Sequence, residues 1–124
     1  MNNEHQFNTR AALKGHDENM FKDYSDNKIV EQSFDWIKKN LDPLMSYIIF
    51  ENDLSNQADS IFSESLMTYQ YLKKENYAIK KVYDSKAFKE YLIVQIDPGN
   101  EDETLGNIMG YGFDKDPIYY LYKA

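Results

Sequence analysis

The sequence predicts an α+β domain, a two-layer sandwich in which a mainly antiparallel sheet is covered by two amphipathic helices. Two observations carry this prediction: apolar residues recur at helical spacing in the first half of the chain, and short period-two runs separated by turn residues follow in the second half. Because consecutive hairpins join the later strands, we expect an antiparallel meander whose apolar face the helices must cover.

Two segments have the spacing of an amphipathic helix. The first is expected to begin at the capping residues Ser25 or Asp26 and to end near Asn40, because Pro43 disfavours helix at the residue before it. Its apolar stripe is Val30, Phe34, Ile37 and Leu41, with Trp36 expected at the edge of the core. The second is expected from Ser55 or Asn56 to the cationic pair at 73–74, with Ala58, Ile61, Phe62, Leu66, Tyr69 and Leu72 as its stripe.

Five segments have the length and composition of strands. They are residues 44–51, 78–83, 88–96, 104–113 and 118–122. Turn residues at 84–86 and at 114–117 suit hairpins, and 97–100 opens a longer acidic loop. Gly106, Gly110 and Gly112 fall inside the fourth predicted strand, so we expect a bulge or bend there.

The chain has the length of one domain and contains no cysteine, so neither a disulfide framework nor a thiolate site is possible. Residues 1–24 show no sustained period and hold both histidines, His5 and His16. They are predicted to form a loosely ordered N-terminal arm, and residues 25–124 a single α+β domain. An apolar leader and a run long enough to span a bilayer are both lacking, which predicts a cytoplasmic protein.

Charge is strongly negative and is arranged in blocks. Twenty-one acidic residues against 14 basic ones give a net charge of −7, which argues against direct binding of nucleic acid and favours a basic partner. No basic residue lies between Lys39 and Lys73 or between Lys89 and Lys115. With 11 tyrosines in the chain, the residues predicted to bind a partner are Glu51, Asp53, Asp97, Glu101, Asp102, Glu103, Tyr111 and Tyr119.

The sequence predicts no catalytic residue, no metal and no cofactor. The acidic run at 97–103 lacks the alternating ligands of an EF-hand loop, although hard cations favour such oxygens. The glycines at 106–112 lack the dinucleotide spacing, and the histidines lack the spacing that holds zinc on a helix.

The leading functional prediction is a small acidic protein that binds and inhibits or neutralises another protein, of the immunity, anti-defence or nucleic-acid-mimic type. Its partner is expected to be basic or nucleic-acid-binding, with no direct contact to nucleic acid or membrane. One alternative is a ligand-binding or regulatory domain with a pocket lined by residues such as Tyr69, Tyr91 and Tyr111. Another is an enzyme with a carboxylate pair such as Asp35 and Glu64. A homodimer formed through an exposed edge strand at 118–122 is also possible.

Overall fold

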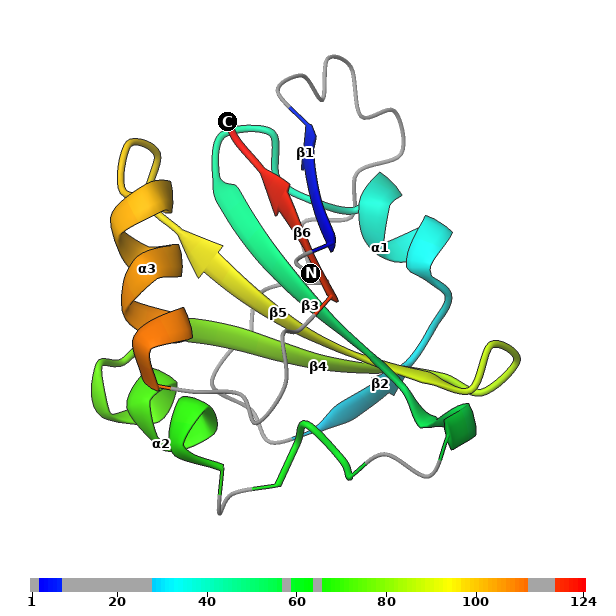
Figure 1. The fold of residues 1–124 in the computed structure, drawn as a ribbon. Coiled ribbons are helices and arrows are strands. Elements are labelled where there is room, and N and C mark those ends of the chain that lie inside the picture. Colours follow the sequence, from blue (N-terminus) through cyan, green and yellow to red (C-terminus); the bar gives the residue numbers. More distant parts are fainter. Residues whose placement is uncertain (1–2, 8–27, 57–58, 64–65, 112–117) are drawn as a thin grey trace.

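The computed structural model describes residues 3–7, 28–56, 59–63, 66–111 and 118–124 of the chain. Figure 1 shows a twisted sheet with helices packed against it. The strands are β1 (Asn3–Phe7), β2 (Ile29–Glu31), β3 (Ser46–Asp53), β4 (Ala78–Asp84), β5 (Lys89–Ile96) and β6 (Ile118–Tyr122). The helices are α1 (Phe34–Lys39), the 3-10 turn η2 (Leu54–Asn56), α2 (Met67–Lys74) and α3 (Glu101–Tyr111).

Among the described residues, six strands form one open, mixed sheet in the order β1-β6-β3-β5-β4-β2. The four inner strands pair antiparallel, and only β1 with β6 and β2 with β4 pair parallel. The predicted α+β class with a mainly antiparallel sheet is therefore confirmed. Four of the five predicted strands are also confirmed, as β3, β4, β5 and β6, and each is rich in β-branched and aromatic residues.

The predicted meander is wrong in its strand order. Only β4 and β5 are neighbours both in sequence and in the sheet, while β3 lies between β5 and β6. Because β6 also pairs with β1, residues 118–122 are not an edge strand. The predicted dimer through that edge therefore loses its structural basis, and the hairpin expected at 114–117 lies outside the described residues.

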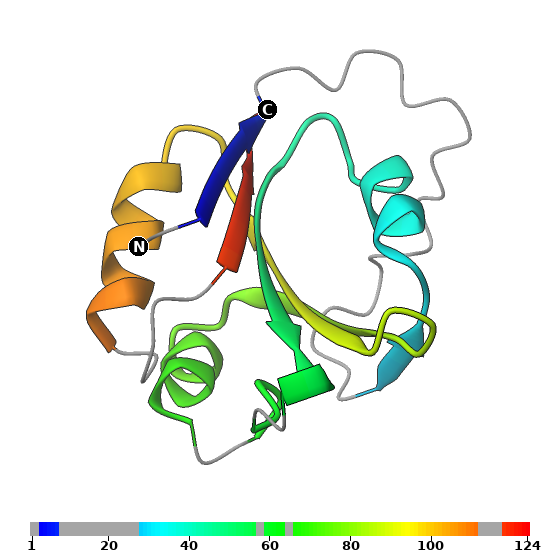
Figure 2. The ribbon, with the colours of Figure 1, turned by 45° about the vertical axis from the view of Figure 1, so that its right-hand side comes forward.

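Alternation along the strands produces two apolar clusters, one on each face of the sheet. On β3, Ile48 and Phe50 belong to one cluster, whereas Tyr47 and Ile49 belong to the other. The first cluster includes residues of α2 and α3, and the second includes α1. Figure 2 shows α2 and α3 on one side of the sheet and α1 on the other, so helices cover both faces rather than one.

The first predicted helix is shorter than expected. Residues 29–31 form β2, because they hydrogen-bond as a parallel strand to β4, and α1 begins only at Phe34. Ser33 caps it, with its Oγ accepting a hydrogen bond from the Trp36 backbone N–H. The helical spacing still identified the buried face, since Ile37 and Leu41 lie in the core. Trp36 packs partly buried at its edge, as predicted.

The second predicted helix is also shorter than expected, because its first part hydrogen-bonds to a side chain of β5. Residues 59–63 are irregular, because the buried Glu90 on β5 accepts hydrogen bonds from Ser60 Oγ at 2.6 Å and from the Ile61 backbone N–H at 3.0 Å. Only residues 67–74 form α2. The apolar stripe nevertheless reaches one core, which contains Ile61, Phe62, Leu66, Tyr69 and Leu72; Ala58 lies outside the described residues.

The segment 104–113 was predicted to be a strand bent at its glycines, and this is wrong. Residues 101–111 form α3, which follows a turn at Pro98 and Gly99, where Gly99 has φ +96°. Three acidic residues occupy its first turn, where the helix dipole stabilises negative charge. Thr104 and Ile108 are buried at helical spacing; Gly112 and Phe113 lie outside the described residues.

Part of the predicted N-terminal arm belongs to the sheet. Residues 3–7 form β1, whose backbone pairs in parallel with β6 and places His5 opposite Tyr120. The remainder of the arm, including His16, lies outside the described residues. The division into an arm and a domain stays a prediction.

Candidate functional site

The predicted acidic residues lie at two opposite ends of the sheet. Ser46 at the start of β3 pairs with Ile96, beside Asp97, whereas Asp53 at the end of β3 pairs with Lys89. Ser46 and Asp53 are seven positions apart along β3, which corresponds to about 23 Å. The two acidic segments therefore do not form one continuous patch.

The end of β3 uses its acidic residues for internal contacts. The Glu51 side chain is only 7% exposed, lies 3.5 Å from Lys89 Nζ, and accepts a hydrogen bond from the Tyr120 hydroxyl at 3.1 Å. Asp53 accepts hydrogen bonds from the hydroxyl and backbone N–H of Ser55, which lower the pKa of Asp53. Both side chains are therefore used for contacts within the chain rather than presented to a partner.

The tyrosines near Glu51 are held in the neutral form. Burial, reinforced by the Glu51 carboxylate, raises the pKa of Tyr120 to about 12 and also raises the pKa of Tyr91. Phe34 of α1 stacks on Tyr91, with ring centroids 5.0 Å apart, and packs at 4.7 Å from Tyr120. This cluster fixes α1 on the sheet.

We expect the free energy of unfolding to fall as the pH rises above about 10. A tyrosine whose pKa is higher in the folded state stabilises the fold fully below the unfolded pKa, near 10, and this stabilisation is lost as the pH rises through the folded pKa. Tyrosinate absorbance of the native protein, compared with Tyr120→Phe, should show one late-titrating group fewer in the variant. Titration of Tyr120 near its ordinary value would contradict the expectation, and Glu51→Gln should lower its pKa.

Tyr119 was predicted to contact a partner, but it is 2% exposed and packs in the core on the α2 and α3 face. Strand alternation explains this position: Tyr119 and Leu121 point toward that core, while Tyr120 points toward α1. Of the three tyrosines on β6, Tyr119 and Tyr122 are buried and Tyr120 is half-buried.

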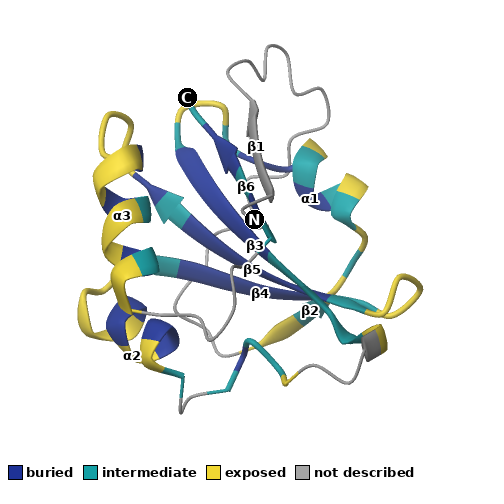
Figure 3. Cartoon of the chain, viewed as in Figure 1, coloured by how far each residue is buried: buried dark blue, intermediate teal, exposed yellow. Residues whose placement is uncertain are grey.

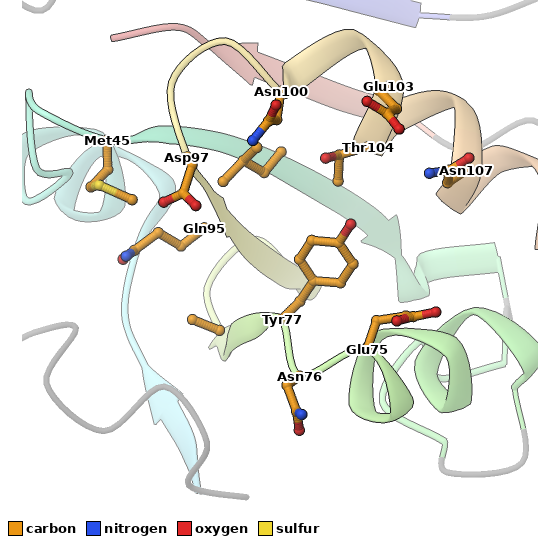
Figure 4. A pocket seen from close by; sticks show the side chains of 12 residues that line it. Met45, Glu75, Asn76, Tyr77, Gln95, Asp97, Asn100, Glu103, Thr104 and Asn107 are labelled. Atoms are coloured by element: carbon orange, nitrogen blue, oxygen red, sulfur yellow. The ribbon is translucent and has the colours of Figure 1, made fainter.

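The other end of the sheet contains a cavity of about 500 Å³ between α3, the turn after α2 and the ends of β4 and β5 (Figure 4). Its lining contains the three carboxylates Glu75, Asp97 and Glu103 and no lysine, arginine or histidine from the described part of the chain. The remaining lining residues are Met45, Asn76, Tyr77, Ala78, Gln95, Ile96, Asn100, Thr104 and Asn107. The lining therefore carries three acidic side chains and no basic one, together with the amide groups of Asn76, Gln95, Asn100 and Asn107.

Two backbone turns create this cavity. Asn76 has a left-handed backbone with φ 59°, which ends α2 and lets Tyr77 enter between α2 and α3. The turn at 97–100 is closed by a hydrogen bond from the Asn100 N–H to the Asp97 carbonyl at 3.1 Å. Asp97 and Glu103 are exposed, and the described residues provide no hydrogen bond or ion pair to either carboxylate.

Glu101 holds the start of α3 in place instead of facing a partner. Its carboxylate is buried, accepts a hydrogen bond from Ser46 Oγ at 2.6 Å and another from the Gly99 N–H at 3.0 Å. Burial raises the pKa of Glu101, but these hydrogen bonds and the nearby Lys123 outweigh it, so the pKa lies below its usual value. Asp102 is exposed and lies 3.7 Å from Lys123 Nζ.

A second, smaller cavity of about 180 Å³ lies between α2 and the end of α3. It is lined by Met67, Gln70, Tyr71, Lys74 and Tyr111. The Tyr71 and Tyr111 rings stack with centroids 4.1 Å apart, and Met67 and Tyr111 are 62% and 47% exposed. Large apolar side chains are thus presented to solvent beside the acidic cavity.

Tyr71 joins the two cavities. Its ring centroid lies 6.2 Å from that of Tyr77 in the large cavity and 4.1 Å from that of Tyr111 in the small one. We call the two cavities and this row of three tyrosines the α2/α3 groove. Burial, with smaller effects from Tyr77, Glu75 and Tyr111, raises the pKa of Tyr71 above its usual value.

Of the eight residues predicted to bind a partner, the structure places Asp97, Glu103 and Tyr111 in the groove. Sequence reasoning missed Glu75, Tyr77 and Tyr71, which reach the groove from α2 and its C-terminal turn. The signal available in the sequence was the run from Tyr71 to Tyr77, where cationic, acidic and aromatic residues follow a helix end. That run does not reveal which side chains face α3.

The outer face of α3 bears two exposed glycines, Gly106 and Gly110, beside Glu103 and Asn107. A Cβ added at either glycine would meet nothing within 4 Å. Glycine in a helix interior is less stable than alanine by roughly 0.5–1 kcal/mol. Internal packing therefore gives no reason for these two residues.

We expect Gly106→Ala and Gly110→Ala each to raise the free energy of unfolding by roughly 0.5–1 kcal/mol, because each reduces the entropy lost on folding. Urea denaturation of each variant and of the double variant measures the effect. Destabilisation by either alanine would show that the open space beside these glycines is needed within the chain.

The described residues contain no group of three or more histidine, aspartate or glutamate side chains that could hold a metal ion. Tyr69 and Tyr91, predicted to line a ligand pocket, are each 2% exposed and lie in the two cores. Asp35 of the predicted carboxylate pair is exposed and lies 3.2 Å from Lys38 Nζ, while Glu64 lies outside the described residues. The groove is suited to hydrogen-bonding an organic cation.

No known protein family, curated protein or solved structure matches the chain. Within the described residues, no helix combines the length and apolar character needed to cross a membrane.

Proposed function

We propose that this protein binds another protein through the α2/α3 groove and inhibits or neutralises it by covering a basic segment. The observation that carries the proposal is the large cavity, in which Glu75, Asp97 and Glu103 have no cationic neighbour among the lining residues that the structure describes. A lysine or arginine side chain supplies the missing positive charge and several hydrogen-bond donors. A net charge of −7 would also raise the rate of association with a basic partner.

A protein partner is favoured over a free small cation by the surface next to the cavity. Exposed Met67 and Tyr111 flank it, and methionine and tyrosine are enriched where proteins meet. A partner that places a basic residue in the cavity covers these apolar side chains at the same time. Covering a basic segment keeps it from phosphate groups or other anions, which is how an acidic protein neutralises a nucleic-acid-binding one.

The small-ligand alternative is favoured by one observation, the volume of the large cavity. About 500 Å³ lies within the range of ligand sites, and its carboxylates would select a polyamine or another small cation. Isothermal titration with spermidine tests this alternative. Stoichiometric binding that Glu103→Gln weakens would support it, and heat no greater than that of dilution would exclude it for this probe.

Affinity capture from the host lysate tests the protein-binding proposal. The wild type is compared with the double variant Asp97→Asn/Glu103→Gln. These two positions are chosen because the described residues provide no hydrogen bond to either carboxylate, so the substitutions should leave the fold intact. The matched control is Asp35→Asn/Asp59→Asn, which makes the same charge change at exposed positions outside the groove. We expect a stoichiometric partner that binds about 100-fold more weakly to the groove variant, is retained by the control, and is lost as salt rises.

Two outcomes would contradict the proposal. One is capture that the groove variant and the control weaken equally, because the partner would then respond to net charge alone. The other is the absence of any partner whose capture depends on Asp97 and Glu103.

A further inference from the structure

The two cavities of the α2/α3 groove lie at different points along α3. Glu103, near the start of α3, lines the large acidic cavity, and Tyr111, its last residue, lines the small one. These two residues are eight positions apart, which corresponds to about 12 Å at 1.5 Å per helical residue. The groove therefore offers two separate points of contact at a defined spacing.

The two points have opposite chemical character. The large cavity gathers carboxylates and amides, whereas the small one is formed by the stacked rings of Tyr71 and Tyr111 and by the exposed Met67. A basic side chain suits the first, because its charge is compensated there. An aliphatic or aromatic side chain suits the second, because it covers apolar surface that now faces solvent.

Next to the row formed by Glu103, Asn107 and Tyr111, the exposed face of α3 is open. Gly106 and Gly110 lie on that face with nothing near the position of a Cβ, while the opposite side of the helix, which carries Thr104 and Ile108, is buried (Figure 3). The absence of side chains lets a second backbone approach the helix closely. The close approach of a partner backbone would explain why α3 keeps two glycines that weaken the helix without improving its packing.

We propose that the groove recognises an extended segment of the partner in which a basic residue and an apolar residue stand four positions apart, on the same face of that segment. An extended chain advances about 3.3 Å per residue and alternates its side chains between two faces, so four positions span about 13 Å and match the separation of the two contact points. The basic side chain enters the large cavity, the apolar one covers Tyr71 and Tyr111, and the intervening backbone runs over Asn107, beside the two glycines. This inference rests on the proposed function and specifies its partner.

Synthetic peptides provide the test. Each is a serine peptide carrying one arginine and one leucine, either four positions apart or adjacent, in both orders along the chain. Chemical-shift titration of the isotope-labelled protein gives each Kd and reports whether the shifts fall on the residues that line the two cavities. We expect the best peptide with four-position spacing to bind about tenfold more tightly than either adjacent peptide.

Variants assign the two contacts. Glu103→Gln should weaken binding of the arginine peptide but not of its glutamine-substituted counterpart, and Tyr111→Ser should remove the advantage of leucine over serine. Gly106→Ala/Gly110→Ala should weaken binding severalfold although the protein is more stable, so lost folding cannot explain that result.

Equal Kd values at both spacings would overturn the inference, as would shifts that fall away from the residues lining the two cavities. If the lysate partner still depends on Asp97 and Glu103 in that case, the proposed function stands and only the recognition pattern is wrong. If capture does not depend on them, the proposed function fails whatever the peptides show.

Discussion

Replacing Glu101 by alanine is expected to lower the free energy of unfolding by about 3 kcal/mol. The buried carboxylate accepts hydrogen bonds from Ser46 Oγ and from the Gly99 N–H, and its loss leaves both donors without this acceptor. Ser46 Oγ also accepts a hydrogen bond from the Ala124 N–H at 3.0 Å, so the chain terminus is affected as well. Urea denaturation at neutral pH measures the change.

The matched control is Asp102→Ala. Asp102 occupies the same first turn of α3 and loses a similar interaction with the helix dipole, but its side chain is 86% exposed. We expect a loss of less than about 1 kcal/mol for this variant. Equal losses in the two variants would show that the dipole, not the buried hydrogen bonds, carries the stability.

The Glu101 carboxylate also limits the stability of the protein at acidic pH. Because the pKa of Glu101 is lower in the folded state than its ordinary value of 4.5, its ionised form stabilises the fold fully above that value. The stabilisation is lost as the pH falls through the lower, folded-state pKa. We expect the wild type to lose stability more steeply than Glu101→Gln over this acidic range, and parallel pH profiles would contradict the assignment.

Replacing Glu90 by alanine is expected to cost about 3 kcal/mol, because three hydrogen bonds end at this one buried carboxylate. The donors are Asn52 Nδ2 at 2.9 Å, Ser60 Oγ at 2.6 Å and the Ile61 backbone N–H at 3.0 Å. The substitution frees the irregular segment that carries Phe62 into the core. Thermal or urea unfolding measures the loss.

Ser60→Ala provides the comparison, since it removes one of the three donors and should cost about 1 kcal/mol. The double variant should be little less stable than Glu90→Ala alone, because the shared contact is already absent. Fully additive losses would show that Ser60 and Glu90 act independently.

The two buried carboxylates, Glu90 and Glu101, show why acidic residues could not be assigned to a binding surface from their sequence alone. In the block from Asp97 to Glu103, Glu101 turns inward to the start of β3, whereas Asp97 and Glu103 line the cavity. Their ionisable groups are identical, and only the packing around α3 separates an internal anchor from a contact residue. The same holds for Glu51, which the sheet places against Tyr120 and Lys89.

The helix α3 was predictable in principle, but two signals conflicted. Three acidic residues after the Pro98-Gly99 turn favour a helix start, and Thr104 and Ile108 have helical spacing. Gly106 and Gly110 lower helix propensity and favour a bent strand. The helix forms because one side of it covers the core around Leu72 and Tyr119, a gain that local propensity does not include.

The sequence by itself determined the fold class, four strands and the apolar faces, because period-two alternation and helical spacing are written directly into residue order. It also determined the negative charge and, by lacking cysteine, the absence of thiolate chemistry. Only the tertiary structure decided the strand order, the shortened helices and the groove. Those features depend on contacts between distant residues, such as Ser46 with Glu101 and Tyr71 with Tyr111, whose energies exceed local preferences and have no pattern within any short window of the chain.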